Sequence, residues 1–553
     1  MVAHGRSNDE TPFPNRFTTA SLRFGVTAFI AATCRGLSQA MSERVNTPGR
    51  IEAARLKIAE LLTTHAEWFC TLDGGESQAL RRSELDIAVA YGRLILTSWT
   101  EKGSRTWKIF DWELTGEKLT LRASRRMGAE RPLIELVPRA AASAIALTVK
   151  TARQKRSVQL GELACSLQSG TKLERASLSP GARRGQPGRY ARILLRQKHQ
   201  RLAVTGSVAA SKASDADAFL AAALLWFKRT GERARPPYIQ QLWLAVESDL
   251  VKSIVQRVAM LRQSLRAAVA VFEVDQQLTE MKLVDVPARE DLWKRRLARF
   301  PPVPAGESSE IARRLVELAP DAIDVVKARH GETLRYFGLP FARVRRVMET
   351  ERLWFGVENL RRRLLDENTE SEWRNLLTEL LTHRTARASD HHHALYRNAA
   401  EAWLESLLRR DITRLDPGLI IAPLHAQFRT ARGGVLGVRP VDLLALRQDG
   451  RLVVIELKVA EAREHVLQGV DYWQRVEAHR RRGHITRAKL FGDRKISNES
   501  PLVYLVAPTL RVHPAFTALA RSIDPDIEIY RFDINEDWRA GVRVMRRMRV
   551  NRS

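Results

Sequence analysis

The chain has 553 residues and carries 91 Lys and Arg against 63 Asp and Glu, a formal net charge of +28. This length predicts three or more domains, and the charge favours a polyanionic partner, of which nucleic acid is the simplest. No apolar run approaches the roughly eighteen residues of a membrane span, which excludes a membrane-spanning protein.

The cysteines are Cys34, Cys70 and Cys165, an odd number at wide spacing. This pattern predicts neither a disulfide framework nor a zinc site. A reducing, cytoplasmic location is therefore expected.

Residues 1–47 are expected to form a disordered extension or to result from a start assigned too early. Within them Phe24–Cys34 is apolar and superficially resembles a secretory signal. Met41 opens a segment that looks like a natural start with a helix behind it, so Met41 and Met1 are alternative first residues.

Residues 48–140 are predicted to form a β-rich domain with a leading helix. The apolar spacing from Pro48 to Thr64 is helical, and short alternating runs with polar turns follow from Leu85 to Val137. Aromatic residues in these runs suit either a base-stacking surface or, as we favour, the core; they are Trp99, Trp107, Phe110 and Trp112.

Residues 141–300 are predicted to form a mixed α/β region. Helical and strand-like runs alternate from Asp215 to Val274, which favours a βαβ-like unit. The glycine-rich loop of an ATP-driven motor is missing from this sequence. Residues 176–190 are rich in Gly, Pro, Ser and Arg and predict a flexible basic loop that could touch phosphates.

Residues 301–394 are predicted to form a helical connector, because Ser309–Leu318, Arg343–Glu351 and Ser371–Leu381 look amphipathic and highly charged. Asp390 precedes three adjacent histidines, His391, His392 and His393. Adjacent side chains point in different directions and seldom close around one ion, so a polar loop is favoured over a metal site.

Residues 395–553 alternate between helical and strand-like runs and predict a mixed α/β sheet. A helix is expected from about Tyr396 to Arg410, a strand within Leu419–Arg429 and a helical stretch over Glu461–Arg482. A buried strand over Pro501–Pro508, a short helix over Ala515–Ser522 and a last strand over Ile527–Phe532 complete the domain.

A β-hairpin in this domain carries the residues with the clearest chemistry. Val441–Leu446 and Leu452–Val459 are strand-like and flank an Asp-Gly turn, so Asp442 is expected beside Glu456. Alternation places Glu456 and Lys458 on one face of the second strand. Charged groups on an otherwise apolar strand are costly unless they are paired or bind a metal, and carboxylates suit Mg²⁺ or Mn²⁺.

These residues resemble the PD-(D/E)xK nuclease superfamily. Pro440-Val441-Asp442 stands for the first half of the motif, Glu456-Leu457-Lys458 for the second, and Gln468-x-x-x-Tyr472 resembles the glutamine-tyrosine motif of RecB-type members. The resemblance covers roughly residues 396–533 and implies a restriction-endonuclease-like αβββαβ core.

The resemblance also implies a site and an activity. Asp442, Glu456 and the main-chain carbonyl of Leu457 would hold the metal, Lys458 would position or activate water, and Gln468 would orient water or contact a phosphate. Tyr472 is an accessory residue with an equally plausible structural role. A helix glutamate assists many members, and Glu405 is preferred over Glu401, with solvent-facing carboxylates as the alternative.

The expected function is that of a Mg²⁺-dependent deoxyribonuclease that hydrolyses phosphodiester bonds, with DNA implied by the resemblance. Basic residues after the glutamine are candidates for phosphate contacts: Arg475, Arg480, Arg481, Arg482 and Arg487. Two alternatives remain open at this point: a nucleic-acid-binding module on the same fold that does not cut, and a basic regulatory protein that binds another protein or RNA.

Overall fold

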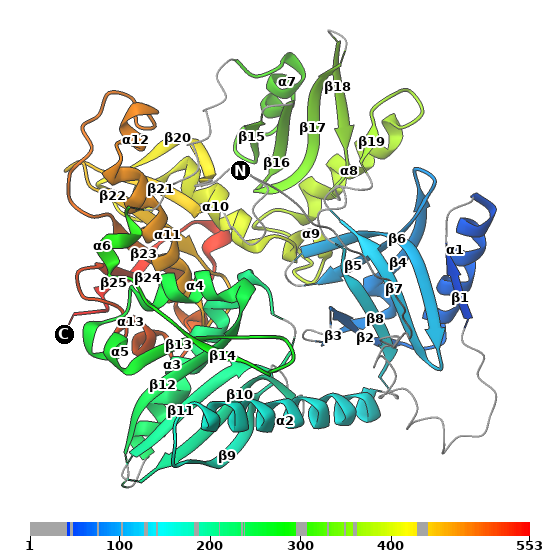
Figure 1. The fold of residues 1–553 in the computed structure, drawn as a ribbon. Helices are drawn as coiled ribbons and strands as arrows, with labels where there is room; N and C mark the ends of the chain where they lie inside the picture. Colours follow the sequence, from blue (N-terminus) through cyan, green and yellow to red (C-terminus); the bar gives the residue numbers. More distant parts are fainter. Residues whose placement is uncertain are drawn as a thin grey trace, which may run out of the picture.

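The computed structural model describes residues 41–44, 48–73, 77–100, 103–125, 131–139, 142–181, 187–198, 200–209, 211–233, 236, 238–294, 307–328, 331–347, 350–357, 362–428 and 441–552. In these ranges the chain forms thirteen α-helices and four β-sheets (Figure 1). The predicted mixed α/β class is confirmed. Within the same ranges, no helix combines the length and the apolar character needed to cross a membrane.

The N-terminal sheet is antiparallel and has eight strands: β1 (Met41–Arg44), β2 (Glu67–Leu72), β3 (Ser77–Arg81), β4 (Leu85–Ala90), β5 (Arg93–Thr100), β6 (Gly103–Thr115), β7 (Lys118–Ser124) and β8 (Leu133–Pro138). Helix α1 (Pro48–Thr63) packs on it. The predicted leading helix and β-rich region are both present. Trp107 and Trp112 are core residues as favoured, whereas Phe110 is exposed.

The prediction of an extension over residues 1–47 is wrong at Met41–Arg44. Strand β1 lies within residues 1–47, yet it pairs with β6 along Met41–Arg44. Backbone pairing of this kind depends on a partner strand far along the sequence, so local composition does not indicate it. The segment Phe24–Cys34 lies outside the described residues.

The middle region begins with a long helix, α2 (Ala142–Ser166), and has a six-stranded sheet in the order β14-β13-β12-β11-β10-β9. Its strands are β9 (Thr171–Pro180), β10 (Pro187–Gln197), β11 (Gln200–Ser207), β12 (Ile239–Glu247), β13 (Val269–Val274) and β14 (Met281–Val284). Its other helices are α3 (Ala216–Arg233), α4 (Ser248–Val258), α5 (Gln263–Ala268) and α6 (Arg289–Leu292). Strands β11, β12 and β13 are parallel, as the βαβ pattern predicts.

The predicted basic loop over residues 176–190 is wrong for most of its length. Strands β9 and β10 extend into it from both sides and pair up to Pro180 and Pro187. The prediction treats glycine, proline and serine as residues that break regular structure. Pairing across a hairpin tolerates them, because only the residues at its turn need special backbone angles.

The helical connector predicted over residues 301–394 is also wrong in part. Helices α7 (Glu310–Leu318) and α8 (Glu370–His383) are present, but between them lies an antiparallel sheet. Its strands are β15 (Ile323–Ala328), β16 (Gly331–Tyr336), β17 (Leu339–Val347), β18 (Thr350–Phe355) and β19 (Arg363–Leu364). The stretch Arg343–Glu351 joins two of these strands, and a run this short does not distinguish helical from strand periodicity.

The C-terminal region has a six-stranded sheet whose spatial order follows the sequence: β20 (Leu419–Phe428), β21 (Val441–Arg447), β22 (Leu452–Leu457), β23 (Leu502–Pro508), β24 (Ile529–Ile534) and β25 (Val544–Arg549). Its helices are α9 (Ala394–Arg397), α10 (Ala400–Arg410), α11 (His465–Arg481), α12 (His484–Arg487) and α13 (Phe516–Ala520). Strand β22 pairs antiparallel with β21 and parallel with β23, so the sheet is mixed.

Three sequence predictions in this region need correction. The helix expected from Tyr396 to Arg410 is divided at Ala399, which has a left-handed backbone (φ +49°). Strand β22 ends at Leu457 rather than Val459. Strand β24 is followed by β25, whose run of arginines and methionines lacks the apolar alternation of a typical strand.

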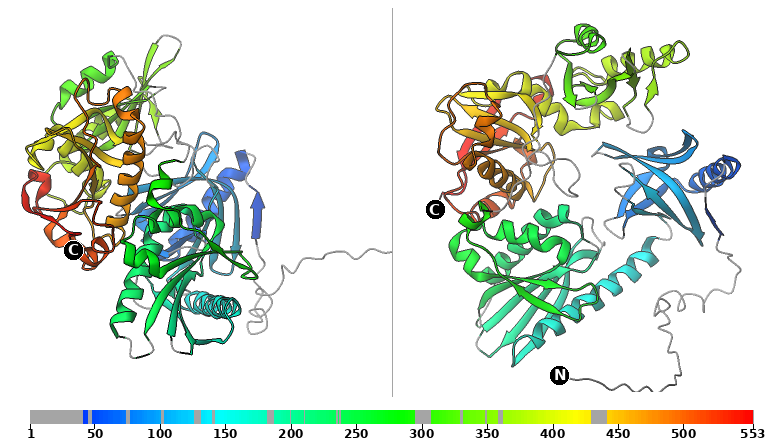
Figure 2. Two further views of the ribbon diagram at one scale, coloured as in Figure 1. Left: turned by 60° about the vertical axis from the view of Figure 1, so that its left-hand side comes forward. Right: turned by 45° about the horizontal axis from the view of Figure 1, so that its top comes forward.

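The middle and C-terminal regions share one hydrophobic core, and their ribbons lie against each other in Figure 2. Buried residues of α3 and α4, including Phe219 and Ile254, belong to the same cluster as Val470 and Trp473 of α11 and Leu505 of β23. Helix α11 therefore lies between the C-terminal sheet and the middle region.

Candidate active site

The β21–β22 hairpin brings the predicted residues together. Leu443 pairs with Ile455 and Leu446 with Leu452, so the register continues toward Asp442 and Glu456. The turn contains Gly450 at φ +83°, where an added Cβ would lie 2.7 Å from the carbonyl oxygen of Lys495. Only glycine fits there without strain, which explains the Asp-Gly turn.

Asp442 and Glu456 form a close pair of carboxyl groups. Asp442 Oδ2 accepts a hydrogen bond from the backbone N–H of Leu457 at 2.9 Å, which anchors it to strand β22. Its negative charge acts on the neighbouring Glu456 carboxyl group and raises the pKa of that group. Two neighbouring carboxylates repel each other unless a proton or a cation lies between them.

Lys458 lies against this pair. Its Nζ is 2.6 Å from Glu456 Oε1 and 3.1 Å from the carbonyl oxygen of Leu457. The expected position on the same face as Glu456 is therefore found, although Lys458 follows the end of β22. Its backbone N–H donates to the carbonyl of Val506 at 3.0 Å, which fixes the chain direction beside β23.

Burial and neighbouring charges together determine the charge states of Glu456 and Lys458. Glu456 is 1% exposed, and this burial, together with Asp442, raises its pKa well above the ordinary value. Burial alone would lower the pKa of Lys458, but the carboxylates of Glu456, Glu401 and Asp442 outweigh it and raise that pKa. The lysine therefore stays charged, and without a cation Glu456 favours its protonated form.

Tyr472 of α11 packs against the hairpin, and Gln468 lies one helical turn before it. Both are buried, and burial together with the nearby Glu456 and Asp442 carboxylates raises the pKa of Tyr472. Its phenol is therefore neutral at physiological pH. Tyr472 also packs in a core cluster with Leu444 and Val454 of the hairpin, which gives it a structural role.

Two buried oxygens in this site have no hydrogen-bond partner among the described residues. They are Glu456 Oε2 and Gln468 Oε1. Buried polar atoms in folded proteins are nearly always hydrogen-bonded, and exceptions indicate an ion, a water or a functional role. Both atoms are acceptors, and acceptors are what a cation or a water molecule would satisfy.

The helix glutamates occupy different environments. Glu405 is buried beside Arg335 of β16, whose guanidinium lies 3.4 Å from its carboxylate. Burial raises the pKa of Glu405 to about 7, with Asp442 adding to the rise and Arg335 opposing it. Glu401 is half-exposed, and its carboxylate lies 3.9 Å from Lys458 Nζ. Glu405, the glutamate preferred from the sequence, thus lies near Asp442. The alternative prediction of a solvent-facing carboxylate holds only for Glu401.

His465 also adjoins the site, although the sequence did not single it out. Its Nε2 lies 3.2 Å from the carbonyl oxygen of Glu456, and the ring is buried. Burial and the charge of Lys458 lower its pKa to about 3. A neutral ring that donates to this carbonyl would fix the backbone under Glu456. The sequence feature that could have indicated His465 is its position one turn before Gln468 on the same helix.

The donor set fits a hard divalent cation. Asp442 and Glu456 provide carboxylates, and the carbonyl of Leu457 adjoins them while accepting from Lys458. Nowhere in the described ranges do three or more His, Cys, Asp or Glu side chains form a group able to hold a metal. Protein oxygens from two carboxylates, completed by water and substrate phosphate, are the usual set for Mg²⁺.

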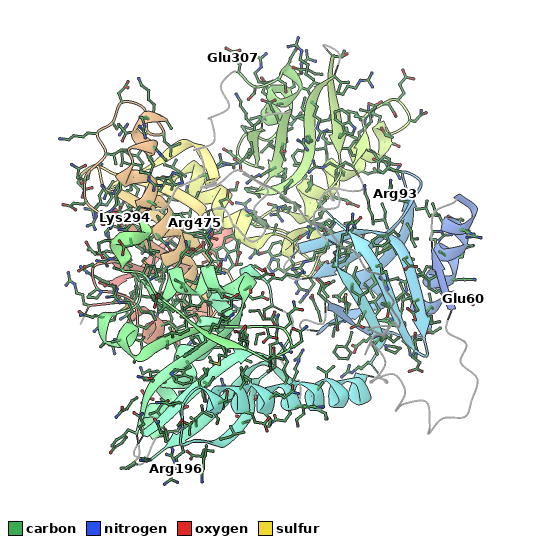
Figure 3. All side chains as sticks on the ribbon, viewed as in Figure 1. Glu60, Arg93, Arg196, Lys294, Glu307 and Arg475 are labelled. Carbon is green, nitrogen blue, oxygen red and sulfur yellow. The ribbon has the colours of Figure 1, made fainter. Side chains whose placement is uncertain are left out.

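The predicted phosphate-binding arginines have internal partners. Arg475 pairs with Asp471 in the same helix (Figure 3 labels Arg475). Arg480 and Arg481 both pair with Glu477, Arg482 donates to the carbonyl of Trp293, and Arg487 donates to that of Arg482. Arg480 follows Gln468 by twelve residues, about 18 Å along the helix axis, so the last turn of α11 lies away from Gln468.

The histidine run forms a polar turn, as favoured. His393 caps α9 by accepting from the backbone N–H of Leu395, and its ring stacks on His383. Cys70 and Cys165 are free thiols, and Cys34 lies outside the described residues.

Comparison of the chain with known protein families, with curated proteins and with solved structures finds no match.

Proposed function

We propose that this protein is a metal-dependent nuclease that hydrolyses phosphodiester bonds of nucleic acid, with DNA as its substrate. The observation that carries the proposal is the partly buried group formed by Asp442, Glu456 and Lys458. In the described residues, Glu456 Oε2 has no hydrogen-bond partner. A divalent cation would bind this oxygen and would also offset the repulsion between the two carboxylates.

The order of elements supports a restriction-endonuclease-like core for the C-terminal region. Helix α10 precedes the three strands β20, β21 and β22, and then α11 and β23 follow. This is the αβββαβ order that the resemblance implies. Asp442 lies on the second of the three strands, and Glu456 lies near the end of the third.

The chain's own residues would divide the work among them. Asp442 and Glu456 would hold Mg²⁺ or Mn²⁺, which when bound lowers the pKa of water and offsets charge on the phosphoryl oxygens. Lys458, charged and fixed by Glu456, would stabilise the negative charge that grows in the transition state. Gln468, whose side-chain carbonyl oxygen has no hydrogen-bond partner among the described residues, would accept a hydrogen bond from the attacking water and orient it.

The charge of the whole chain supports a nucleic-acid substrate. The net charge of +28 favours association with a polyanion, and side chains that end in nitrogen are spread over the coloured regions of Figure 3. Because the helix arginines after Tyr472 mostly bind internal partners, other basic residues would make many of the phosphate contacts.

Cleavage assays test the proposal. Labelled plasmid, linear duplex, single-stranded DNA and RNA would be incubated with the protein and Mg²⁺ or Mn²⁺. We expect metal-dependent cutting of DNA that falls by at least about 100-fold in Asp442→Ala and in Lys458→Ala, because each removes part of the charge stabilisation. Asp449→Ala, which removes an exposed carboxylate from the turn of the same hairpin, should cut normally.

Two results would count against cleavage at this site. One is the absence of cutting by the parent protein with either metal, on any of the four substrates. The other is equal activity of Asp442→Ala and Asp449→Ala. Nucleic-acid binding without cutting, unchanged in both site variants, would favour the binding-module alternative.

A further inference from the structure

The antiparallel sheet β15–β19 carries an unusual concentration of arginines on one face. Arg343 and Arg345 alternate on β17, so both point to the same side. Arg345 lies directly opposite Arg352 of β18, and Arg343 lies directly opposite Trp354. These four side chains therefore share one face, while Val344 and Leu353 are buried on the other.

Arg362 joins them from the segment before β19. It lies two residues before Leu364, which pairs with Trp354, so it points to the same face. The pKa of Arg362 is lowered to about 10 by burial and by the positive charges of Arg343 and Arg345. Burial and Arg345 likewise lower the pKa of Arg343. We call Arg343, Arg345, Arg352, Arg362 and Trp354 the arginine face.

Charges on the arginine face lack compensation within the described part of the chain. The Nε atoms of Arg343 and Arg362 are buried without a hydrogen-bond partner there. Directly opposed like charges destabilise a sheet. The contrast with Arg363 is informative, because that neighbour of Arg362 pairs with Glu372 of α8. The repulsion between these arginines lowers the stability of the folded protein, and a bound anion would offset that repulsion.

We infer that the arginine face binds the phosphate backbone of single-stranded nucleic acid. Guanidinium groups recognise phosphate oxygens through paired N–H donors, and several of them side by side match a repeating phosphate chain. Trp354 lies among them and is half-exposed. An aromatic ring between backbone-binding cations allows an unpaired base to stack, which a duplex does not offer.

This inference goes beyond the proposed cleavage, because the binding surface belongs to a different sheet and does not require a metal. The two need separate tests. Binding is therefore measured with the full chain in EDTA, where no cutting takes place. The probe is a fluorescein-labelled DNA strand of mixed sequence, about 20 nucleotides long, and its duplex form serves for comparison.

The decisive comparison uses two neighbouring residues of β17. Arg345→Glu reverses a charge on the arginine face, and Arg346→Glu makes the same change at an exposed residue on the opposite face. We expect Arg345→Glu to weaken single-strand binding by about tenfold or more and to reduce its salt dependence, because each lost phosphate contact lowers the slope by about 0.7. Arg346→Glu should change affinity by less than about twofold.

Trp354→Leu tests the stacking contact. It should weaken binding of the single strand, leave the salt dependence unchanged and have little effect on the duplex. Circular dichroism spectra and melting temperatures of all three variants establish that each is folded. A folded variant with altered binding then reports on the surface itself.

The inference is overturned by any of three results: no binding of the single strand by the parent protein, equal losses in Arg345→Glu and Arg346→Glu, or binding of polyglutamate as tightly as DNA. The last would assign the face to an acidic protein. Failure of the cleavage assay with loss of binding in Arg345→Glu alone would reject the nuclease proposal and keep this one.

Discussion

At the scale of single residues, the candidate site contains several charged groups that are buried and only partly compensated. Glu456, Lys458 and Glu405 are all withdrawn from water, and Glu456 Oε2 has no partner in the described ranges. Such groups cost stability, since burial favours their neutral forms. Their concentration around one hairpin is the pattern expected where function outweighs stability.

Glu405 provides a test of this cost through pH. Its pKa in the folded protein is about 7, above the ordinary value of 4.5. The folded state therefore holds a proton that the unfolded state has released, and the stability contributed by protonated Glu405 is lost as pH rises from about 4.5 through 7. At about 1.4 kcal/mol for each unit of pKa, the loss is about 3 kcal/mol.

Urea unfolding of the parent protein and Glu405→Gln at several pH values measures this loss. The parent should lose about 3 kcal/mol relative to the variant between pH 4.5 and 8, because glutamine does not ionise. Glu401→Gln is the control on the same helix, and its effect should stay small because its side chain is half-exposed. If the difference in unfolding free energy between the parent protein and Glu405→Gln does not change with pH, the raised pKa of Glu405 is contradicted.

At the scale of elements, close packing of α11 on the sheet positions Gln468. Gly469 follows it in the helix, and a Cβ at Gly469 would lie 2.5 Å from Leu505 Cδ2 and 3.0 Å from Val503 Cγ1. Both contacts are with buried residues of β23. The helix can approach the sheet this closely only because residue 469 has no side chain.

Gly469→Ala should therefore destabilise the protein by about 1–3 kcal/mol, since the buried neighbours must move. It should also reduce cleavage by displacing Gln468. The matched control is Gly231→Ala in α3, where no atom lies within 4 Å of the added Cβ. There we expect a gain of about 0.5–1 kcal/mol, because alanine favours helix. Equal effects of the two substitutions on the melting temperature would show that the close contact has no energetic consequence.

At the scale of the whole molecule, a buried ion network joins the middle and C-terminal regions. Arg257 of α4 binds Asp217 of α3 through two hydrogen bonds of 2.5 and 3.0 Å, and its guanidinium lies 3.4 Å from Asp471 of α11. All three side chains are buried beside the shared core. Asp471 is next to Tyr472, which packs against the candidate site. The position of this part of α11 therefore depends on contacts with the middle region.

Arg257→Ala should cost about 3–5 kcal/mol, because buried Asp217 loses this arginine and buried Asp471 keeps only its pair with Arg475. Chemical denaturation followed by Trp fluorescence measures this, and the two regions should unfold in one transition because they share a core. Lys294→Ala, which removes an exposed ion pair with Asp291, should leave the free energy of unfolding nearly unchanged. Two separate transitions in the parent protein would be evidence against the common core.

Local patterns in the sequence were sufficient for the features that depend on neighbours along the chain. The hairpin around Gly450 and the common side of Glu456 and Lys458 both follow from a period of two and a turn residue with a positive φ. The mixed α/β class and the buried strand β23 follow from apolar runs of strand length.

Only the tertiary structure decided the features that depend on contacts between distant segments. The charged stretch Arg343–Glu351 forms strands because β16 and β18 flank β17, although its local pattern suggested a helix. The neutral His465, the Arg335–Glu405 contact and the internal partners of the α11 arginines likewise arise from burial against other regions. Periodicity records which side of an element is apolar, whereas burial and charge compensation depend on what that side meets.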